Sequence, residues 1–180
     1  KAQYPGEVRI GKNIFWVFGN LLASGEDHAG ETLMLIYLVP CTELIELRDA
    51  YMRSHPVVAI ISIDNYEELM KDATDSEKSS ILADIDKKIS EWTKESRALL
   101  RKYDRDKYVF VLEENDFAKL QQKKFGVLES VRQIQSRAGV LATLSIGIGK
   151  DGESYEENWR NAGVALDMAL SRGGDQAVIK

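Results

Sequence analysis

The stretch Leu99-Leu-Arg-Lys-Tyr-Asp-Arg-Asp-Lys-Tyr-Val-Phe-Val-Leu-Glu113 decides the fold prediction. Two runs with β propensity flank a tight polar turn at Asp104-Arg105, which predicts a β-hairpin. The second run is almost continuously hydrophobic, as expected for a strand that is buried on both faces. Asp106 lies where the turn enters this strand, and its carboxylate needs a partner because burial of an unpaired charge is costly. Arg105, Lys107 or a metal ion could be that partner.

The composition restricts the class of protein. The chain has 180 residues, of which 44% are hydrophobic and 29% charged, enough for one globular domain plus a short extra segment. A net charge of −5 without a basic cluster argues against nucleic acid as the main partner. A single cysteine, Cys41, excludes an internal disulfide framework and fits a reducing compartment. The longest apolar run, 32–39, is too short to cross a bilayer, so any membrane anchor is expected to lie outside this sequence.

The first part of the chain predicts a fragment of a sheet and a connecting helix. Residues 1–40 contain two runs with strand character, 13–22 and 32–39, joined by a polar, glycine-containing connector. An isolated two-stranded hairpin is barely stable in water, so these strands are expected to belong to a larger sheet. Thr42 can cap a helix whose end is marked by Ser54-His-Pro56, and residues 41–55 are therefore predicted to link two domains.

Residues 56–180 predict the main domain. The branched aliphatic run 57–63 indicates a central strand, and Asp64-Asn-Tyr-Glu67 and Ser154-Tyr-Glu-Glu157 have the form of capping boxes. Asp64 is accordingly interpreted first as a helix cap. The remaining predicted elements are helices over 77–97 and 115–135 and strands at 140–148 and 176–179, with Trp16, Trp92 and Trp159 on apolar, core-facing sides. The order predicts an α/β (α+β) fold, a mixed sheet flanked by helices.

This order of elements resembles the GGDEF domain of diguanylate cyclases, a relative of the nucleotidyl-cyclase fold. Ile61-Ser-Ile-Asp-Asn-Tyr66 resembles the family's L-D-I-D-x-F, and Tyr103-Asp-Arg-Asp-Lys-Tyr108 stands in place of Y-G-G-[DE]-E-F. Leu144-Ser-Ile-Gly-Ile148 resembles V-S-I-G-I, and 162–173 resembles A-D-x-A-L-Y-x-A-K-x-x-G. Four ordered motifs, covering 57–180, form a specific signal for this fold.

The departures from the family's motifs concern its catalytic groups. Active cyclases use two carboxylates to hold Mg²⁺ against a triphosphate; the first position here is Ser62, a weaker ligand, and Asp106 keeps the second. Charged Asp104 and Arg105 replace the two glycines that let a nucleotide approach the backbone. The other positions that the resemblance assigns to guanine, phosphate and product binding hold Met70, Leu170, Gly174, Glu95 and Ala98. Diguanylate cyclase activity is therefore not expected.

The same departures resemble the degenerate GGDEF domain of GdpP/YybT-type cyclic-di-AMP phosphodiesterases. That resemblance implies a membrane-anchored, cytoplasmic, homodimeric protein in which 1–40 end a PAS domain, 41–55 form a signalling helix and a DHH-type phosphodiesterase domain follows elsewhere. It also implies slow ATP hydrolysis with Mg²⁺ or Mn²⁺, in which Asp106 acts as the catalytic group and metal ligand. Asp64 and the Ile63 carbonyl would assist with the metal, and the nucleotide contacts would be made by Ser62, Asp64, Arg105 and Lys107.

Two alternatives from other classes remain open. Asp104, Arg105, Asp106 and Lys107 can form a self-neutralising exposed turn, in which case the domain is a catalytically inactive spacer that dimerises and transmits signals between PAS and DHH domains. Gly147-Ile-Gly-Lys-Asp-Gly152 satisfies the dinucleotide pattern G-x-G-x-x-G. The acidic residue that such a site needs would fall inside a helix, near Asp167, so the segment is interpreted as a strand-to-helix turn.

Overall fold

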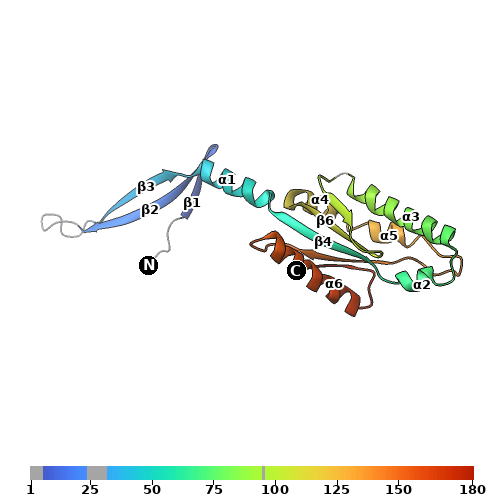
Figure 1. Ribbon diagram of the computed structural model, residues 1–180. Coiled ribbons are helices and arrows are strands. Elements are labelled where there is room, and N and C mark those ends of the chain that lie inside the picture. Colours follow the sequence, from blue (N-terminus) through green and yellow to red (C-terminus); the bar gives the residue numbers. More distant parts are fainter. Residues whose placement is uncertain (1–5, 24–31, 95) are drawn as a thin grey trace. The chain divides into compact units, whose positions relative to one another are not determined.

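The computed structural model describes residues 6–23, 32–94 and 96–180 (Figure 1). Two compact units divide the chain, Lys1–Met52 and Arg53–Lys180. The polar connector predicted between the first two strands lies almost entirely outside the described residues.

The smaller unit contains an antiparallel sheet in the order β1-β2-β3. Its elements are β1 (Gly6–Ile10), β2 (Asn13–Ala23), β3 (Thr32–Pro40) and α1 (Thr42–Arg53), the last crossing the boundary between the units. The Cys41 amide donates to the Ile14 carbonyl at 2.9 Å, and the Thr42 hydroxyl accepts from the Ile14 amide at 2.8 Å. These bonds fix the start of α1 against β2. Thr42 is the first residue of α1, and its hydroxyl bonds to β2.

The larger unit contains a five-stranded sheet in the order β5-β6-β4-β7-β8, parallel only between β7 and β8. The strands are β4 (Pro56–Ile63), β5 (Leu99–Lys102), β6 (Lys107–Glu113), β7 (Leu144–Gly149) and β8 (Ala177–Ile179). The predicted hairpin is therefore confirmed as β5 and β6. Central β4 is buried along its length from Val57 to Ile63, as its aliphatic sequence predicts.

Helices cover both faces of this sheet (Figure 1). They are α2 (Tyr66–Met70), α3 (Asp75–Thr93), α4 (Glu114–Gln122), α5 (Val127–Val131) and α6 (Tyr155–Ser171). Alternate residues of β4 divide the core: Ala59 and Ile61 pack with the cluster of α2 to α5, whereas Val58 and Ile60 pack against Ala162 and Leu166 of α6. This two-faced burial confirms the predicted mixed sheet flanked by helices.

Two glycines of the G-x-G-x-x-G segment let α6 lie directly on β7. A Cβ on Gly147 would collide with the backbone of Ala162 and Leu166, and one on Gly149 would lie 2.6 Å from the Ala162 nitrogen. Only hydrogen fits where a strand and a helix backbone approach this closely. Helix packing accounts for both glycines, in agreement with the predicted strand-to-helix turn.

Several local predictions were wrong. The single helix expected over 115–135 is interrupted between α4 and α5, where Lys124 and Phe125 have positive φ, and β7 begins at Leu144 rather than at 140. Tyr108, Phe110 and Leu112 of β6 are buried, but the alternate residues of that strand are only half-buried. Trp159 is 40% exposed because it lies on the flank of α6 rather than beneath it. No side chain caps α2, and Asp64 instead bonds elsewhere.

Candidate functional site

A hollow of about 350 Å³ opens between the β5–β6 turn and the segment that follows β4. Its lining residues are Ile63, Asp64, Asn65, Tyr66, Glu67, Glu68, Arg105 and Asp106. Four of these side chains are carboxylates and one is cationic. The hollow is thus acidic, and it brings together the three residues that the sequence proposed as metal ligands.

Asp106 and Ile63 meet because the hairpin pairs with the end of β4. The Ile63 amide donates to the Asp106 carbonyl at 2.9 Å, continuing the β4–β6 ladder past Ser62 and Lys107. Asp106 is half-buried and lines the hollow. Asp106 directly precedes β6, so the backbone bond to Ile63 holds this residue at the edge of the hollow.

Arg105 extends from the hairpin turn to α2. Its guanidinium carbon lies 5.8 Å from the centre of the Tyr66 ring, and Nη2 lies 3.2 Å from Glu67 Oε1. Both side chains of this ion pair are mostly exposed, so the pair contributes little to stability. Its effect is local: one positive charge partly offsets the acidic lining.

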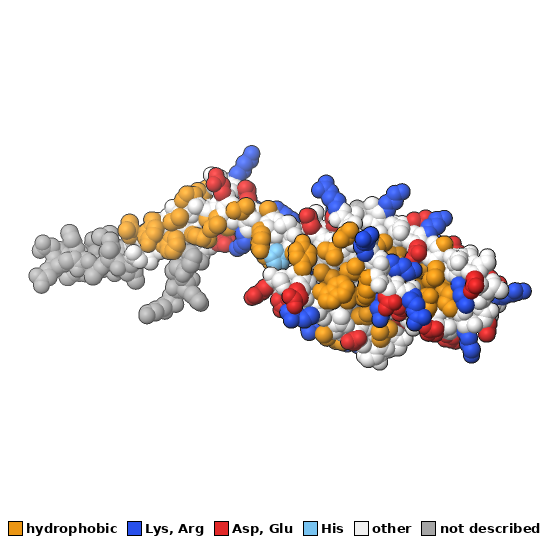
Figure 2. Space-filling view, in the orientation of Figure 1, with side chains coloured by type: hydrophobic (Ala, Val, Ile, Leu, Met, Phe, Trp, Pro, Cys, Tyr) orange, Lys and Arg blue, Asp and Glu red, His pale blue; other side chains and the backbone are white. Residues whose placement is uncertain are grey.

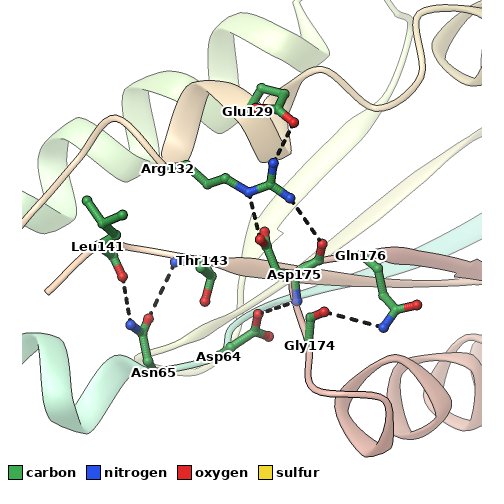
Figure 3. A network of polar contacts seen from close by, with 9 residues as sticks. All are labelled: Asp64, Asn65, Glu129, Arg132, Leu141, Thr143, Gly174, Asp175 and Gln176. Atoms are coloured by element: carbon green, nitrogen blue, oxygen red, sulfur yellow. Dashed lines mark hydrogen bonds and ion pairs between the residues drawn. The ribbon is translucent and has the colours of Figure 1, made fainter.

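Asp64 belongs to a polar network beneath the hollow (Figure 3). Its Oδ2 accepts from the Asp175 amide at 2.8 Å, and its Oδ1 is buried without a hydrogen-bond partner among the described residues. The Asp175 carboxylate in turn accepts from Arg132 Nε at 2.6 Å. The carboxylate of Asp64 therefore ties β4 to the turn before β8, a role that its sequence neighbours do not reveal.

The neighbouring Asn65 fixes the start of α2. Its Nδ2 donates to the Leu141 carbonyl at 2.7 Å, and its Oδ1 accepts from the Thr143 amide (Figure 3). Because these bonds cross to the segment before β7, the floor of the hollow is held at both sides. Asn65, Asp175 and Arg132 were not predicted as site residues, because their partners lie far away in the sequence.

Ser62 and Lys107 are placed differently from the other proposed site residues. They pair with each other across β4 and β6, and neither lines the hollow. Ser62 is only 3% exposed and lies on the side of the sheet that faces α6, in register with Ser145. The structure brings together Ile63, Asp64, Arg105 and Asp106 around the hollow. Ser62 and Lys107 lie outside it.

The other positions taken from the cyclase motifs lie as follows. Met70 is buried in the core, Leu170 is partly exposed on α6, and Gly174 adopts φ +76°. Ala98 packs against the core, whereas Glu95 lies outside the described residues. An apolar buried side chain at Met70 cannot offer hydrogen bonds to a guanine base.

The hydroxyl of Tyr108, in strand β6, bonds to helix α3. It donates to Asp86 Oδ1 at 2.5 Å, and Lys102 Nζ lies 4.9 Å from the centre of its ring. Burial, followed by this hydrogen bond, raises the pKa of Tyr108 well above its ordinary range. The phenol thus stays neutral and serves packing rather than proton transfer.

The oxygen atoms around the hollow suit a cation that takes only one or two ligands from the protein. Among the described residues, no group of three or more His, Cys, Asp or Glu side chains is arranged to hold a metal ion. Asp106 and the Ile63 carbonyl could supply two oxygen ligands. Mg²⁺ fits such a site, because it usually binds one or two carboxylates and takes its remaining ligands from water and phosphate.

Comparison with known protein families gives one specific match. The family model described as the GGDEF domain of cyclic-di-AMP phosphodiesterase GdpP-like proteins matches residues 61–180. The chain is 33% identical over 146 residues to cyclic-di-AMP phosphodiesterase GdpP of Bacillus subtilis, and 36% identical over 146 residues to GdpP of Geobacillus thermodenitrificans. Each match covers 81% of this chain and 22% of the relative.

A third relative matches a longer part of the chain. Cyclic-di-AMP phosphodiesterase PdeA of Listeria monocytogenes is 30% identical over 167 residues, covering 90% of this chain and 25% of that protein. The chain therefore spans about a quarter of the length of these relatives. No helix among the described residues is long and apolar enough to cross a membrane.

Solved structures share the fold. The active GGEEF domain of a diguanylate cyclase from Vibrio cholerae matches with a TM-score of 0.62 at 14% identity, covering 76% of this chain and 89% of that one. The FimX GGDEF domain from Pseudomonas aeruginosa matches with a TM-score of 0.59 at 19% identity, covering 77% and 92%. Similarity at this level of identity establishes the fold, whereas the function has to be argued from the residues of the site.

Proposed function

Since the chain belongs to the family of GdpP-like GGDEF domains of cyclic-di-AMP phosphodiesterases, we propose that it is a degenerate, regulatory module that binds a nucleotide in the acidic hollow. ATP is the candidate nucleotide, with Mg²⁺ or Mn²⁺ as the cation. The module hydrolyses ATP slowly at most and has no diguanylate cyclase activity. The single observation that carries the proposal is the shared placement of Asp106 and Ile63 on that hollow.

The chemistry of the site supports slow turnover. A bound divalent cation would neutralise charge on the phosphate oxygens, and Asp106 with the Ile63 carbonyl would hold it. Ser62 stands in place of the first carboxylate and does not line the hollow, so Asp106 is the one carboxylate of the pair that remains there. Asp64 adds negative charge behind it, with one oxygen engaged by the Asp175 amide.

Arg105, Tyr66 and Lys107 are the proposed contacts for the nucleotide itself. Arg105 lines the hollow and can exchange Glu67 for a phosphate, since an exposed ion pair is weak. The half-buried ring of Tyr66 offers an aromatic face that selects no particular base. Lys107 does not line the hollow, but it follows Asp106 in the chain and adds positive charge to this edge of the sheet. The buried Met70 disfavours guanine, which supports the exclusion of cyclase activity.

Calorimetry and phosphate release with the 180-residue chain test this proposal. The wild type is expected to bind ATP only with Mg²⁺ and to release phosphate slowly. An Asp106→Asn variant is expected to lose phosphate release and at least tenfold of the Mg²⁺-dependent affinity. Asp104→Asn is the matched control, because Asp104 lies in the same turn, is exposed and does not line the hollow. Equal behaviour of wild type and Asp106→Asn would overturn the proposal.

The wider context of the module is also proposed. We place 1–40 at the end of a PAS domain, 41–55 in a signalling helix, and the module on the cytoplasmic side of a membrane-anchored protein that carries a DHH-type phosphodiesterase domain. Support comes from β3, in which every residue from Met34 to Val39 is exposed although all six are hydrophobic. A sheet with such a strand is expected to pack against further structure.

The exposed aromatic side chains favour a second candidate function, dimerisation and signal transmission without nucleotide. Tyr103 at the hairpin and Trp159 on α6 contact each other at 5.6 Å between ring centres, and both are at least 40% exposed. Hydrophobic side chains gather on the visible face of the larger unit in Figure 2. Sedimentation of wild type and Trp159→Glu tests this function: a dimer that the variant abolishes supports it, and a monomeric wild type excludes it.

A further inference from the structure

The β5–β6 side of the large sheet is left open on the face that carries α6. Of the helices in the described part of the chain, α2 to α5 pack on the opposite face, and α6 packs mainly on β4, β7 and β8. Neighbouring strands lie about 4.8 Å apart and a helix is about 10 Å wide, so the two outer strands leave room for one further helix.

Four side chains of β5 and β6 form this open strip: Leu99, Arg101, Val109 and Val111. Pairing of the strands sets Leu99 beside Val111 and Arg101 beside Val109, and paired side chains lie on the same face of a sheet. Leu99 is 62% exposed, and the two valines are only half-buried against α6.

The flank of α6 beside the open strip is apolar as well. Trp159, Leu166 and Leu170 recur at helical spacing and form one stripe. Trp159 contacts Tyr103, which follows β5, at 5.6 Å between ring centres, and Leu166 packs with the two valines of the strip. Since Trp159 and Leu170 are 40% and 39% exposed, the strip and the stripe form one apolar surface that faces solvent.

Two opposite charges lie at the same height on this surface. Arg101 on the strip and Asp167 on the outer side of α6 are both exposed, and within the described ranges neither forms an ion pair. Leu166, which precedes Asp167, packs on Gly147. From that glycine one row of paired residues crosses the sheet to β5, through Gly147, Ile60, Val109 and Arg101.

We propose that a second copy of the chain covers the open strip with its own α6, so that two parallel α6 helices lie side by side between two sheets. The two-fold axis runs between the helices and along them. It sets Trp159 and Leu170 against the same residues of the second copy, and the outer side of each α6 onto the open strip of the other copy.

The charges agree with this arrangement. A two-fold axis parallel to the helices keeps equal heights opposite each other, so Asp167 of each copy meets Arg101 of the other. A second copy therefore supplies both the missing helix and the missing counter-charges, through one self-complementary surface. This inference rests on the second candidate function, dimerisation, and names its surface; it does not depend on nucleotide binding.

Sedimentation of charge variants of the 180-residue chain tests this inference. Asp167→Arg and Arg101→Asp are each expected to raise the dissociation constant of the dimer by about tenfold or more, because each sets like charges opposite one another. The double variant, which exchanges the two charges, is expected to return to within about threefold of wild type. Asp84→Arg is the matched control, because it makes the same charge change at an exposed position of α3, on the other face of the sheet.

Oxidative crosslinking of single-cysteine variants locates the helix pair. In a Cys41→Ser background, Leu170→Cys is expected to give a disulfide-linked dimer, whereas Met168→Cys, on the opposite flank of α6, is expected to give none. A monomeric wild type would overturn both this inference and the dimerisation function. A dimer that the Asp167 and Arg101 variants leave unchanged, or that crosslinks at Met168 and not at Leu170, would overturn this inference and leave dimerisation standing.

Discussion

The close contact between Gly147 of β7 and the backbone of α6 gives a testable prediction. Replacing Gly147 by Ala places a methyl group against the Ala162 carbonyl and the Leu166 amide, and 2.6 Å from Leu166 Cβ. Two of these three neighbours are backbone atoms of a helix, which cannot turn away as a flexible side chain could. Overpacking a core costs about 1–3 kcal/mol, and the rigid surroundings here place the expected loss near about 3 kcal/mol.

Gly163, in the helix α6 that packs against Gly147, provides a matched control. No atom lies within 4 Å of the position that its Cβ would take, and Gly163 is inside α6. Gly163→Ala is therefore expected to stabilise the protein by about 0.5–1 kcal/mol, because alanine loses less backbone entropy than glycine in a helix. The two Gly→Ala variants should change stability in opposite directions and differ from each other by about 3.5–4 kcal/mol.

Urea unfolding followed by far-ultraviolet circular dichroism measures this difference. The midpoint should fall for Gly147→Ala and rise for Gly163→Ala, with an unchanged m-value. If Gly147→Ala stayed within about 0.5 kcal/mol of wild type, the interpretation of this glycine as a close-packing residue would be refuted. A stable variant with altered nucleotide binding would instead restore the dinucleotide interpretation of the segment.

Three further predictions concern single contacts. Thr74→Ala removes a capping box in which the Thr74 hydroxyl and the Glu77 side chain each bond the other's backbone, and should cost about 1 kcal/mol in urea unfolding. The Lys119 ammonium at 2.5 Å and a backbone amide hold the pKa of Asp116 below its usual value. Its contribution to stability is therefore present above the unfolded pKa, about 3.9, and is lost as pH falls through the folded value. The stability difference between wild type and Asp116→Asn should accordingly shrink below about pH 4 in acid titrations, and a constant difference would contradict this. Arg105→Ala should tighten the binding of Mn²⁺ alone by up to about fivefold, because an exposed pair is worth at most about 1 kcal/mol, while weakening ATP binding in the same calorimetric titration.

The sheet of the larger unit could be predicted because its strands carry their signals locally. Branched aliphatic residues mark β4, and a charged turn between two apolar runs marks the β5–β6 hairpin. Strand β1, only five residues long and partly charged, has too short an alternation to be recognised. The break between α4 and α5 depends on positive φ at Lys124 and Phe125. Lysine and phenylalanine rarely adopt positive φ, so the sequence does not indicate the break.

Part of the candidate site could be predicted, because the two sequence motifs that carry it lie on paired strands. Pairing of β4 with β6 is enough to bring Ile63 to Asp106. The partner of Asp64 was not predictable, because Asp175 is 111 positions away and bonds through its backbone. A D-x-x-E pattern at Asp64 therefore indicated a helix cap, whereas tertiary structure assigns the carboxylate to a distant turn.

The most direct test of the central claim is to locate Mn²⁺–ATP on the chain by paramagnetic broadening of backbone amide signals. Mn²⁺ held by Asp106 and the Ile63 carbonyl should broaden the amides of 63–68 and 105–106 far more than those of α5 or β8. The same experiment on Asp106→Asn should remove that selectivity. Selective broadening at another place, or none with saturating Mn²⁺–ATP, would contradict the proposal that this hollow binds a metal–nucleotide complex.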